Sequence, residues 1–233
     1  MRYDLLFSDS VFFMILVNKL NTIGEHPFVF SGQAGQLEAV LTIPPNRHES
    51  YVALLGHPHS LQGGTMNNKV VTAMARAFKE IGIPSLRFNF RGVGQSEGRY
   101  DAGIGESHDM LALMRLWQQE NPTARFLLAG FSFGSYVAYR AAAQSKNELL
   151  ITVAQPVHHY DYREFTASPE PWLIMQGDED EVVPLSLVLD FAAQSTPPLA
   201  VTRFAETSHF FHGKLLELKD QLIKGFSHAG LKL

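Results

Sequence analysis

The sequence predicts an α/β protein built on a doubly wound, mostly parallel β-sheet of about eight strands. Short apolar segments typical of buried strands alternate with segments whose apolar residues recur at helical spacing. A length of 233 residues, with 45% hydrophobic and 18% charged residues, is enough to bury one sizeable core. No internal repeat, low-complexity tract or linker interrupts the alternation, so we expect one domain with helices on both faces of the sheet.

The order of the elements supports this arrangement. Residues 27–30 and 37–43 are apolar runs separated by turn residues at 31–35, and they predict an antiparallel hairpin at one edge of the sheet. Further strands are expected at 51–55, 84–90, 125–129, 149–154, 172–176 and 199–204. Helices are expected at 68–81, 104–119, 133–144, 185–194 and 214–226. Because strands and helices alternate from residue 51 onward, these strands should pair in parallel.

Composition limits the partners and the compartment. The chain has 19 Lys and Arg against 23 Asp and Glu, and this net charge of −4 gives no electrostatic basis for binding nucleic acid or an anionic membrane. It contains no cysteine, which excludes disulfides, thiolate metal sites and a cysteine nucleophile. The longest apolar run, residues 11–17, is too short to span a bilayer. We therefore expect a cytoplasmic protein with a loosely attached extension, residues 1–24, before the domain at 25–233.

The sharpest motif is the Gly-x-Ser-x-Gly segment at residues 130–134, which follows an expected strand and begins an expected helix. This is the context of a nucleophile elbow. The turn is so tight that the positions two before and two after the serine have no room for a large side chain. It lifts the hydroxyl of Ser132 above the edge of the sheet. The backbone N–H of Phe133 then lies at a helix N-terminus, where an oxyanion is stabilised.

A serine hydroxyl is a poor nucleophile alone and needs a base, which in turn needs an orienting carboxylate. The acid is expected in the loop after the strand 172–176, where Asp or Glu occupies every position from 178 to 181. We choose Asp180, with Asp178 second, because the apolar residues 182–184 re-enter the core and orient the residue just before them. The other acidic side chains of this loop are expected to be solvated.

The base is expected in the loop after the strand 199–204. His209 is our first candidate there, and His212 is the alternative. The acid lies 48 residues after the serine and the base lies 29 residues after the acid, so each interval holds about one strand and one helix. Both candidates thus lie at the carboxyl ends of strands, where doubly wound sheets place their ligands.

The second oxyanion donor should come from the loop after the strand 51–55. That loop, residues 56–66, contains glycines and a proline that suit a backbone shaped to direct an N–H at the nucleophile. We favour the amide of His59, with Ser60 as the fallback.

Two other interpretations compete for these segments. A metal site could draw on the histidines at positions 57, 59, 158, 159, 209 and 212. No complete zinc-ligand pattern is present, and such a site would leave the serine motif unused, so we expect neither metal nor cofactor. The Gly-x-Gly at residues 92–94 lacks the third glycine of a dinucleotide fingerprint and the lysine of a P-loop, which favours a structural turn.

With these residues placed, residues 27–228 resemble a serine α/β-hydrolase, and most closely the small bacterial hydrolases grouped near dienelactone hydrolase-like proteins. The matching segments are 57–59 (His-Pro-His), 63–71 (Gly-Gly-Thr-Met-Asn-Asn-Lys-Val-Val), 87–94 (Arg-Phe-Asn-Phe-Arg-Gly-Val-Gly), 130–134 and 209–214 (His-Phe-Phe-His-Gly-Lys). The resemblance implies Ser132 as nucleophile, Asp180 as acid, His209 as base, and oxyanion amides from Phe133 and the His59 region. Two features depart from the pattern. Ser60 replaces an expected proline, and dienelactone hydrolase itself has a cysteine nucleophile.

In this superfamily a lid usually lies between the strands that end near residue 154 and begin near residue 172. The 17 residues between them, 155–171, are too few for a cap domain. The stretch 158–162 within them is expected to be a plain surface loop. A small apolar acyl pocket could draw on Phe131, Phe133, Phe210 and Phe211, although Phe131 is expected to face the core.

We therefore expect a serine hydrolase that acts on a small or medium carboxylic ester or thioester, a small-molecule substrate. The competing class is a non-catalytic binding or scaffolding protein on a hydrolase fold, because a fold does not determine a function. A peptidase or C–C bond hydrolase would use the same three residues.

Overall fold

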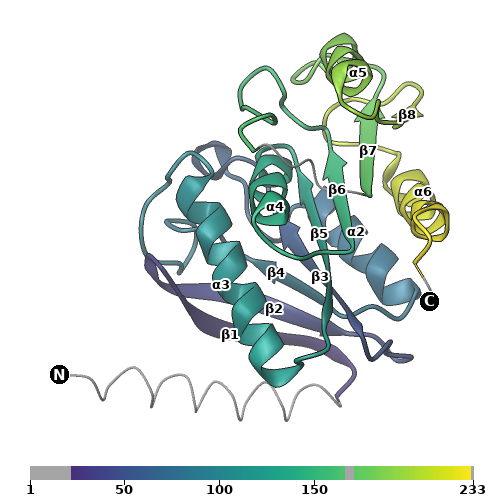
Figure 1. The fold of residues 1–233 in the computed structure, drawn as a ribbon. Helices are drawn as coiled ribbons and strands as arrows, with labels where there is room; N and C mark the ends of the chain where they lie inside the picture. The colour runs from purple at the N-terminus through teal and green to yellow at the C-terminus, as the bar shows by residue number, and fades with distance from the viewer. Residues whose placement is uncertain (1–21, 166–170, 232–233) are drawn as a thin grey trace.

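The computed structural model describes residues 22–165 and 171–231, whose strands form one eight-stranded sheet (Figure 1). The strands are β1 (Gly24–Gly32), β2 (Gly35–Ile43), β3 (Tyr51–Gly56), β4 (Ser85–Phe88), β5 (Arg125–Phe131), β6 (Leu149–Val153), β7 (Trp172–Gly177) and β8 (Val201–Phe204). Their order is β1-β2-β4-β3-β5-β6-β7-β8. The β1–β2 and β2–β4 pairs are antiparallel and all the others are parallel, which confirms the predicted fold class.

The N-terminal hairpin is longer than its apolar residues indicate. β1 pairs with β2 from Gly24 to Gly32, whereas the apolar run covers only residues 27–30. The difference arises because backbone hydrogen bonds to β2 extend the strand through polar residues at both of its ends. Alternate side chains of β1 face the core, as Phe30 does, while Val29 is exposed. The predicted extension, residues 1–24, lies almost entirely outside the described residues.

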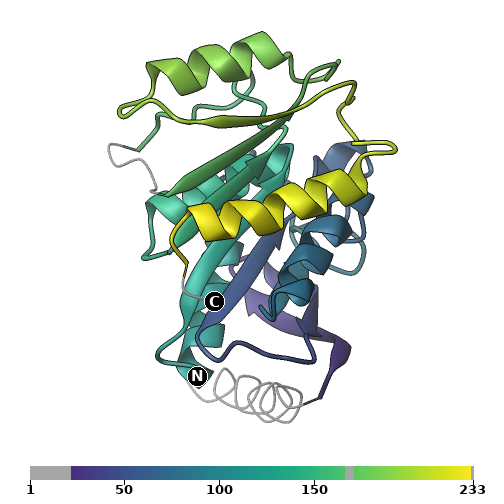
Figure 2. The same cartoon turned by 90° about the vertical axis from the view of Figure 1, so that its right-hand side faces the viewer.

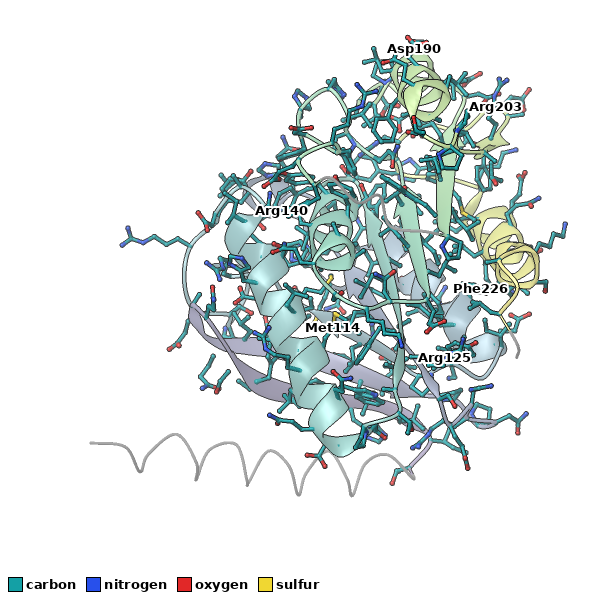
Figure 3. The ribbon with its side chains drawn as sticks, in the orientation of Figure 1. Met114, Arg125, Arg140, Asp190, Arg203 and Phe226 are labelled. Atoms are coloured by element: carbon teal, nitrogen blue, oxygen red, sulfur yellow. The ribbon has the colours of Figure 1, made fainter. Side chains whose placement is uncertain are left out.

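Helices cover both faces of the sheet. They are α2 (Lys69–Glu80), α3 (Ile104–Glu120), α4 (Phe133–Ala143), α5 (Leu185–Gln194) and α6 (Leu215–His228). The helices α3, α4 and α5 pack into one hydrophobic cluster, and α2 and α6 pack into the other. Met114 on α3 and Phe226 on α6 mark these two layers in Figure 3, and Figure 2 shows α6 crossing the sheet. No helix within the two described ranges is long and apolar enough to cross a membrane.

The carboxyl ends of the parallel strands β3 to β8 lie along one edge of the sheet. The chain leaves β3 toward β4 on one side and continues with β5 on the other, so a crevice opens beyond the ends of β3 and β5. Doubly wound sheets bind ligands at such switch points. The loops that follow these strands carry every residue that we predicted to be catalytic.

Candidate active site

Ser132 lies on the turn between β5 and α4, with backbone angles φ 52° and ψ −124°. A positive φ is costly for a residue with a side chain, and close packing of glycines around the turn maintains it. A Cβ on Gly130 would lie 2.0 Å from the carbonyl oxygen of Gly134, and a Cβ on Gly134 would lie 2.3 Å from the carbonyl carbon of Gly56. Glycine is therefore required at both ends of the motif, as the sequence predicts. The contact between Gly134 and Gly56 shows that α4 approaches the end of β3 closely.

The structure brings together the three residues predicted as nucleophile, base and acid. Nε2 of His209 is 3.1 Å from Oγ of Ser132, and Nδ1 of the same ring is 2.9 Å from Oδ2 of Asp180. All three are buried, with Ser132 9% exposed at the mouth of the site. Because an ionised carboxylate can only accept, Nδ1 carries the proton that His209 donates to Asp180. Nε2 of the neutral ring is then an acceptor that faces the serine hydroxyl.

The two aspartates of the acidic loop after β7 have different hydrogen-bond partners. Oδ1 of Asp180 accepts the backbone N–H groups of Val182 at 2.9 Å and Val183 at 2.7 Å, which orients the carboxylate toward His209. The rival Asp178 binds Arg203 instead, with both carboxylate oxygens on the guanidinium at 2.9 and 2.8 Å. Figure 3 labels Arg203 at the outer part of the molecule, near β8. Asp178 is thus engaged in a surface ion pair.

The loop that carries His209 is held against the acidic loop. A Cβ on Gly177 would lie 2.3 Å from the carbonyl oxygen of Thr207, so the two loops approach as closely as they do only because residue 177 is glycine. The same carbonyl accepts the N–H of Glu179 at 3.1 Å. The N–H of His209 donates to the carboxylate of Glu181 at 3.3 Å. Acid and base are therefore positioned as one unit at the ends of neighbouring strands.

The two predicted oxyanion donors lie in the segments that follow β3 and β5. The N–H of Phe133 is the first of α4, where no acceptor exists within the helix and the helix dipole favours negative charge. His59 precedes the short 3₁₀ helix Ser60–Gln62, and its ring packs against Tyr100 and Phe133 with centroids 4.9 and 5.2 Å apart. Its carbonyl accepts the N–H groups of Gln62 and Gly64, each at 3.0 Å, which leaves the loop tightly turned.

A cavity of about 140 Å³ opens onto Ser132 and His209, and His59 lines it as well. A second cavity of about 300 Å³ adjoins the first along the N-terminal end of α2, since Gly63 and Phe210 line both. Together they form a short groove that leads away from the serine hydroxyl.

His57 has a structural role in this region. Its ring is fully buried, its Nδ1 donates to the carbonyl of Pro58 at 2.7 Å, and its Nε2 accepts the N–H of Phe90 at 2.9 Å. Burial lowers the pKa of His57 from 6.5 to about 4, so the ring is neutral at pH 7. Among residues 22–165 and 171–231, no group of three or more His, Asp or Glu side chains could hold a metal ion.

The aromatic residues near the serine divide between core and groove. Phe131 faces the core as expected, with its ring against that of His209 at 5.0 Å. Phe133 and Phe211 are also fully buried in the core, and neither lines the cavity at the serine. Phe210 is 41% exposed and lines the cavity at the serine. The exposed His212, our alternative base, stacks on Phe210 at 6.0 Å, whereas His209 faces the serine.

The segment after β6 is more than the plain surface loop that we expected. Tyr162 is buried, and its hydroxyl is 2.7 Å from Oγ of Ser135, which donates to the carbonyl of Ser132 at 2.6 Å. The segment is therefore tied to the nucleophile turn through two hydroxyl groups. His158 and His159 do lie on the surface, with their rings 3.9 Å apart.

The glycine-rich turn after β4 ties several elements together. Nε of Arg91 donates to the buried carboxylate of Asp109 on α3 at 2.7 Å. Oγ of Ser96 donates to the carbonyl of Asn89 at 2.8 Å, and the side chain of Asn89 accepts the N–H of Met66 at 2.8 Å. These bonds connect the turn to α3 and to the loop after β3, in keeping with the structural role that we expected.

Comparisons with known proteins agree with this geometry. The family model described as an alpha/beta hydrolase domain matches residues 52–219. An uncharacterized protein of Rickettsia prowazekii is 38% identical over 168 residues, 69% of this chain and 69% of that protein.

Two solved structures are similar over nearly the whole described chain. An alpha-beta serine hydrolase homologue from Coxiella burnetii is 44% identical, with a TM-score of 0.84, over 88% of this chain and 98% of that one. A serine hydrolase without a lid from Xanthomonas campestris is 39% identical, with a TM-score of 0.85, over 90% of this chain and 96% of that one. The chain therefore belongs to the alpha/beta hydrolase family, in the serine hydrolase superfamily, and is a hydrolase.

Proposed function

We propose that this hydrolase cleaves a small or medium carboxylic ester or thioester through an acyl-enzyme formed on Ser132. The observation that carries the proposal is the continuous hydrogen-bond chain from Ser132 through His209 to Asp180, at 3.1 and 2.9 Å, beside a cavity open to the serine hydroxyl. A serine with this arrangement has an adjacent base and an oriented imidazole, the two features that make a hydroxyl nucleophilic.

The chemistry follows from the positions of the protons. Oγ of Ser132 attacks the carbonyl carbon as Nε2 of His209 takes the hydroxyl proton, and Asp180 stabilises the imidazolium that forms. The imidazolium then protonates the departing alcohol or thiol, which leaves the acyl group on the serine. Water attacks this acyl-enzyme with His209 as the base, and the carboxylic acid departs while Ser132 regains its proton.

Negative charge on the carbonyl oxygen is stabilised at two backbone amides in this proposal. The N–H of Phe133 has no acceptor within α4 and lies at the positive end of that helix. The N–H of His59 supplies the second donor from the loop after β3. Burial, together with the charge of nearby His159, lowers the pKa of His59, so its ring is neutral where the substrate carbonyl would lie.

The size of the groove supports a substrate of modest length. The cavity at the serine holds about 140 Å³ and the adjoining one about 300 Å³, toward the small end of the roughly 300–1,000 Å³ that ligand pockets span. Ser132 is still partly exposed, and Phe210 presents an apolar surface beside it. A compact acyl or leaving group therefore fits this site better than a long acyl chain.

The test is the intact mass of the protein after exposure to a fluorophosphonate probe. We expect one stoichiometric adduct on the wild type and none on Ser132→Ala, because only an activated serine reacts with the phosphorus centre. Ser186→Ala is the matched control, since this exposed serine lies on α5 and should leave labelling unchanged. A folded wild type that stays unlabelled would contradict the proposal and favour a non-catalytic binding protein.

A further inference from the structure

Gln176 is a buried polar residue at the end of β7, beside the candidate acid. Its side chain is fully buried. Nε2 donates to Oδ2 of Asp180 at 3.0 Å and to the carbonyl of Val183 at 2.9 Å. Gln176 thus binds both the carboxylate and the backbone of the loop that carries it.

The two oxygens of Asp180 have different partners. Oδ1 accepts two backbone N–H groups, from Val182 and Val183. Oδ2 accepts Nε2 of Gln176 and lies 2.9 Å from Nδ1 of His209, which is also 3.1 Å from Oδ1. Gln176 is therefore the only donor, besides the histidine itself, that the described part of the chain supplies to the oxygen closest to His209.

The orientation of the Gln176 amide follows from its neighbours. Nε2 faces the Asp180 carboxylate and the Val183 carbonyl, which can only accept hydrogen bonds, so the nitrogen must lie on this side. The other amide atom, Oε1, is buried without a hydrogen-bond partner among the described residues. A buried unpaired carbonyl costs free energy.

We propose that Gln176 is a positioning residue for the reaction. It holds the carboxylate of Asp180 aligned with His209 and lowers the basicity of that carboxylate. The inference rests on the proposed function, since it assigns Gln176 a role in the same hydrogen-bond chain. A donor to a carboxylate shares its charge and reduces its attraction for a neighbouring cation. Loss of the Gln176 amide leaves Asp180 held only through Oδ1, by the N–H groups of Val182 and Val183, and makes the carboxylate hold the imidazolium form of His209 more strongly.

Other charged groups lie near Asp180 and His209, and a substitution of Gln176 leaves them unchanged. Glu181 accepts the backbone N–H of His209, and His158 approaches Asp180 from the segment after β6. Asp178 is paired with Arg203. Substitution at position 176 therefore removes the bonds that Nε2 donates to Asp180 and to the carbonyl of Val183 and leaves these charged groups unchanged.

The first test is steady-state hydrolysis of 4-nitrophenyl acetate by Gln176→Met as a function of pH. We expect kcat to fall about 10- to 100-fold, the range expected for losing one hydrogen bond to a charged group, while KM stays nearly constant. The acid limb of the kcat/KM profile should move to higher pH by roughly half a unit or more, because imidazolium persists to higher pH.

Gln155→Met is the matched control. Gln155 is a second fully buried glutamine, in the segment that follows β6, and its Oε1 accepts Oγ1 of Thr152 at 2.6 Å. Its replacement also removes a buried hydrogen bond, but none that reaches Asp180 or His209. We expect Gln155→Met to lose stability without moving the pH profile. A general packing defect at position 176 would have the same effect, so a moved profile in Gln176→Met distinguishes positioning from packing.

A second variant, Gln176→Glu, carries the test if Gln176→Met does not fold. A protonated glutamate has nearly the shape of glutamine and can donate to Asp180, whereas an ionised one repels it. Two carboxyl groups this close cannot both ionise readily. The kcat/KM profile of Gln176→Glu should therefore contain an additional ionisation that the wild type and Gln155→Glu lack.

The outcomes separate the two proposals. A wild type that neither labels with fluorophosphonate nor hydrolyses the ester overturns both the proposed function and this inference. An active wild type with a folded Gln176→Met whose kcat and acid limb match the wild type overturns the inference alone. A Gln176→Glu profile with no additional ionisation does the same.

Discussion

His57 makes the stability of this protein depend on pH below neutrality. Its ring is fully buried and neutral, with Nδ1 bonded to the carbonyl of Pro58 and Nε2 bonded to the N–H of Phe90. A protonated ring has no acceptor at Nε2, so it could not keep the bond to Phe90. Protonation therefore favours the unfolded chain, where the ring is free in water.

The magnitude follows from the two pKa values. The native pKa of about 4 lies below the ordinary 6.5, so between these pH values the unfolded chain binds a proton that the folded chain does not. The contribution of His57 is fully present above about pH 6.5 and is lost as the pH falls through about 4. At pH 5 the loss amounts to about 2 kcal/mol, and below pH 4 it approaches about 3 kcal/mol.

The assay compares urea unfolding at pH 7.5 and pH 5 for the wild type and His57→Gln, followed by the fluorescence of the buried Trp117 and Trp172. Glutamine can still accept from Phe90 but does not titrate. We expect the wild type to lose about 2 kcal/mol more than His57→Gln between the two pH values. The exposed His212→Gln should behave like the wild type, and equal losses in the wild type and His57→Gln would refute the argument.

Two further predictions concern carboxylates. Asp180→Asn should lower kcat by about 10⁴-fold with the fold intact, because asparagine no longer orients His209. Asp178→Asn should leave turnover of 4-nitrophenyl acetate nearly unchanged. A large loss of activity in Asp178→Asn would show that the acid is misassigned. Asp109→Asn should reduce the free energy of unfolding by about 3–5 kcal/mol, because it breaks a buried ion pair with Arg91. Asp178→Asn, which breaks only a surface pair, is the comparison in urea unfolding, and similar losses in both variants would contradict this estimate.

Local patterns in the sequence were sufficient for much of the fold. Strands and helices from residue 51 onward are recognisable because a buried strand and an amphipathic helix each impose a short-range spacing on apolar residues. Their ends were less accurate. β4 ends at Phe88, two residues before the predicted end, because Phe90 donates its N–H to His57 rather than to a neighbouring strand. Nothing in the local spacing of residues 84–90 indicates this partner.

The nucleophile turn was also recognisable from neighbouring residues in the sequence. Gly130 follows from the steric requirements of the turn itself, whereas Gly134 is required by the close approach of Gly56 in β3. The motif is nevertheless contained within five residues, so Ser132 could be chosen from the sequence. The acidic loop and His209 were chosen from their order along the chain and their places after strands, and Asp180 was preferred because the apolar residues 182–184 follow it. The structure brings His209 to Ser132 and Asp180 to His209.

What only the tertiary structure decided are contacts that the local spacing of apolar residues does not predict. Phe211 alternates with exposed neighbours in a loop, yet it packs against Phe204 in the core, because β8 and the loop after it fold together there. Tyr162 reaches the nucleophile turn through Ser135, and Gln176 reaches Asp180 from the strand before it.

By itself, then, the sequence determined the order of strands and helices, the mostly parallel sheet and the nucleophile turn, since these depend on spacing within a few residues. The tertiary structure decided which carboxylate faces His209, that His57 is a neutral core residue, and that Gln176 donates a hydrogen bond to Asp180. Each of these depends on burial and on a hydrogen-bond partner that only the folded chain supplies.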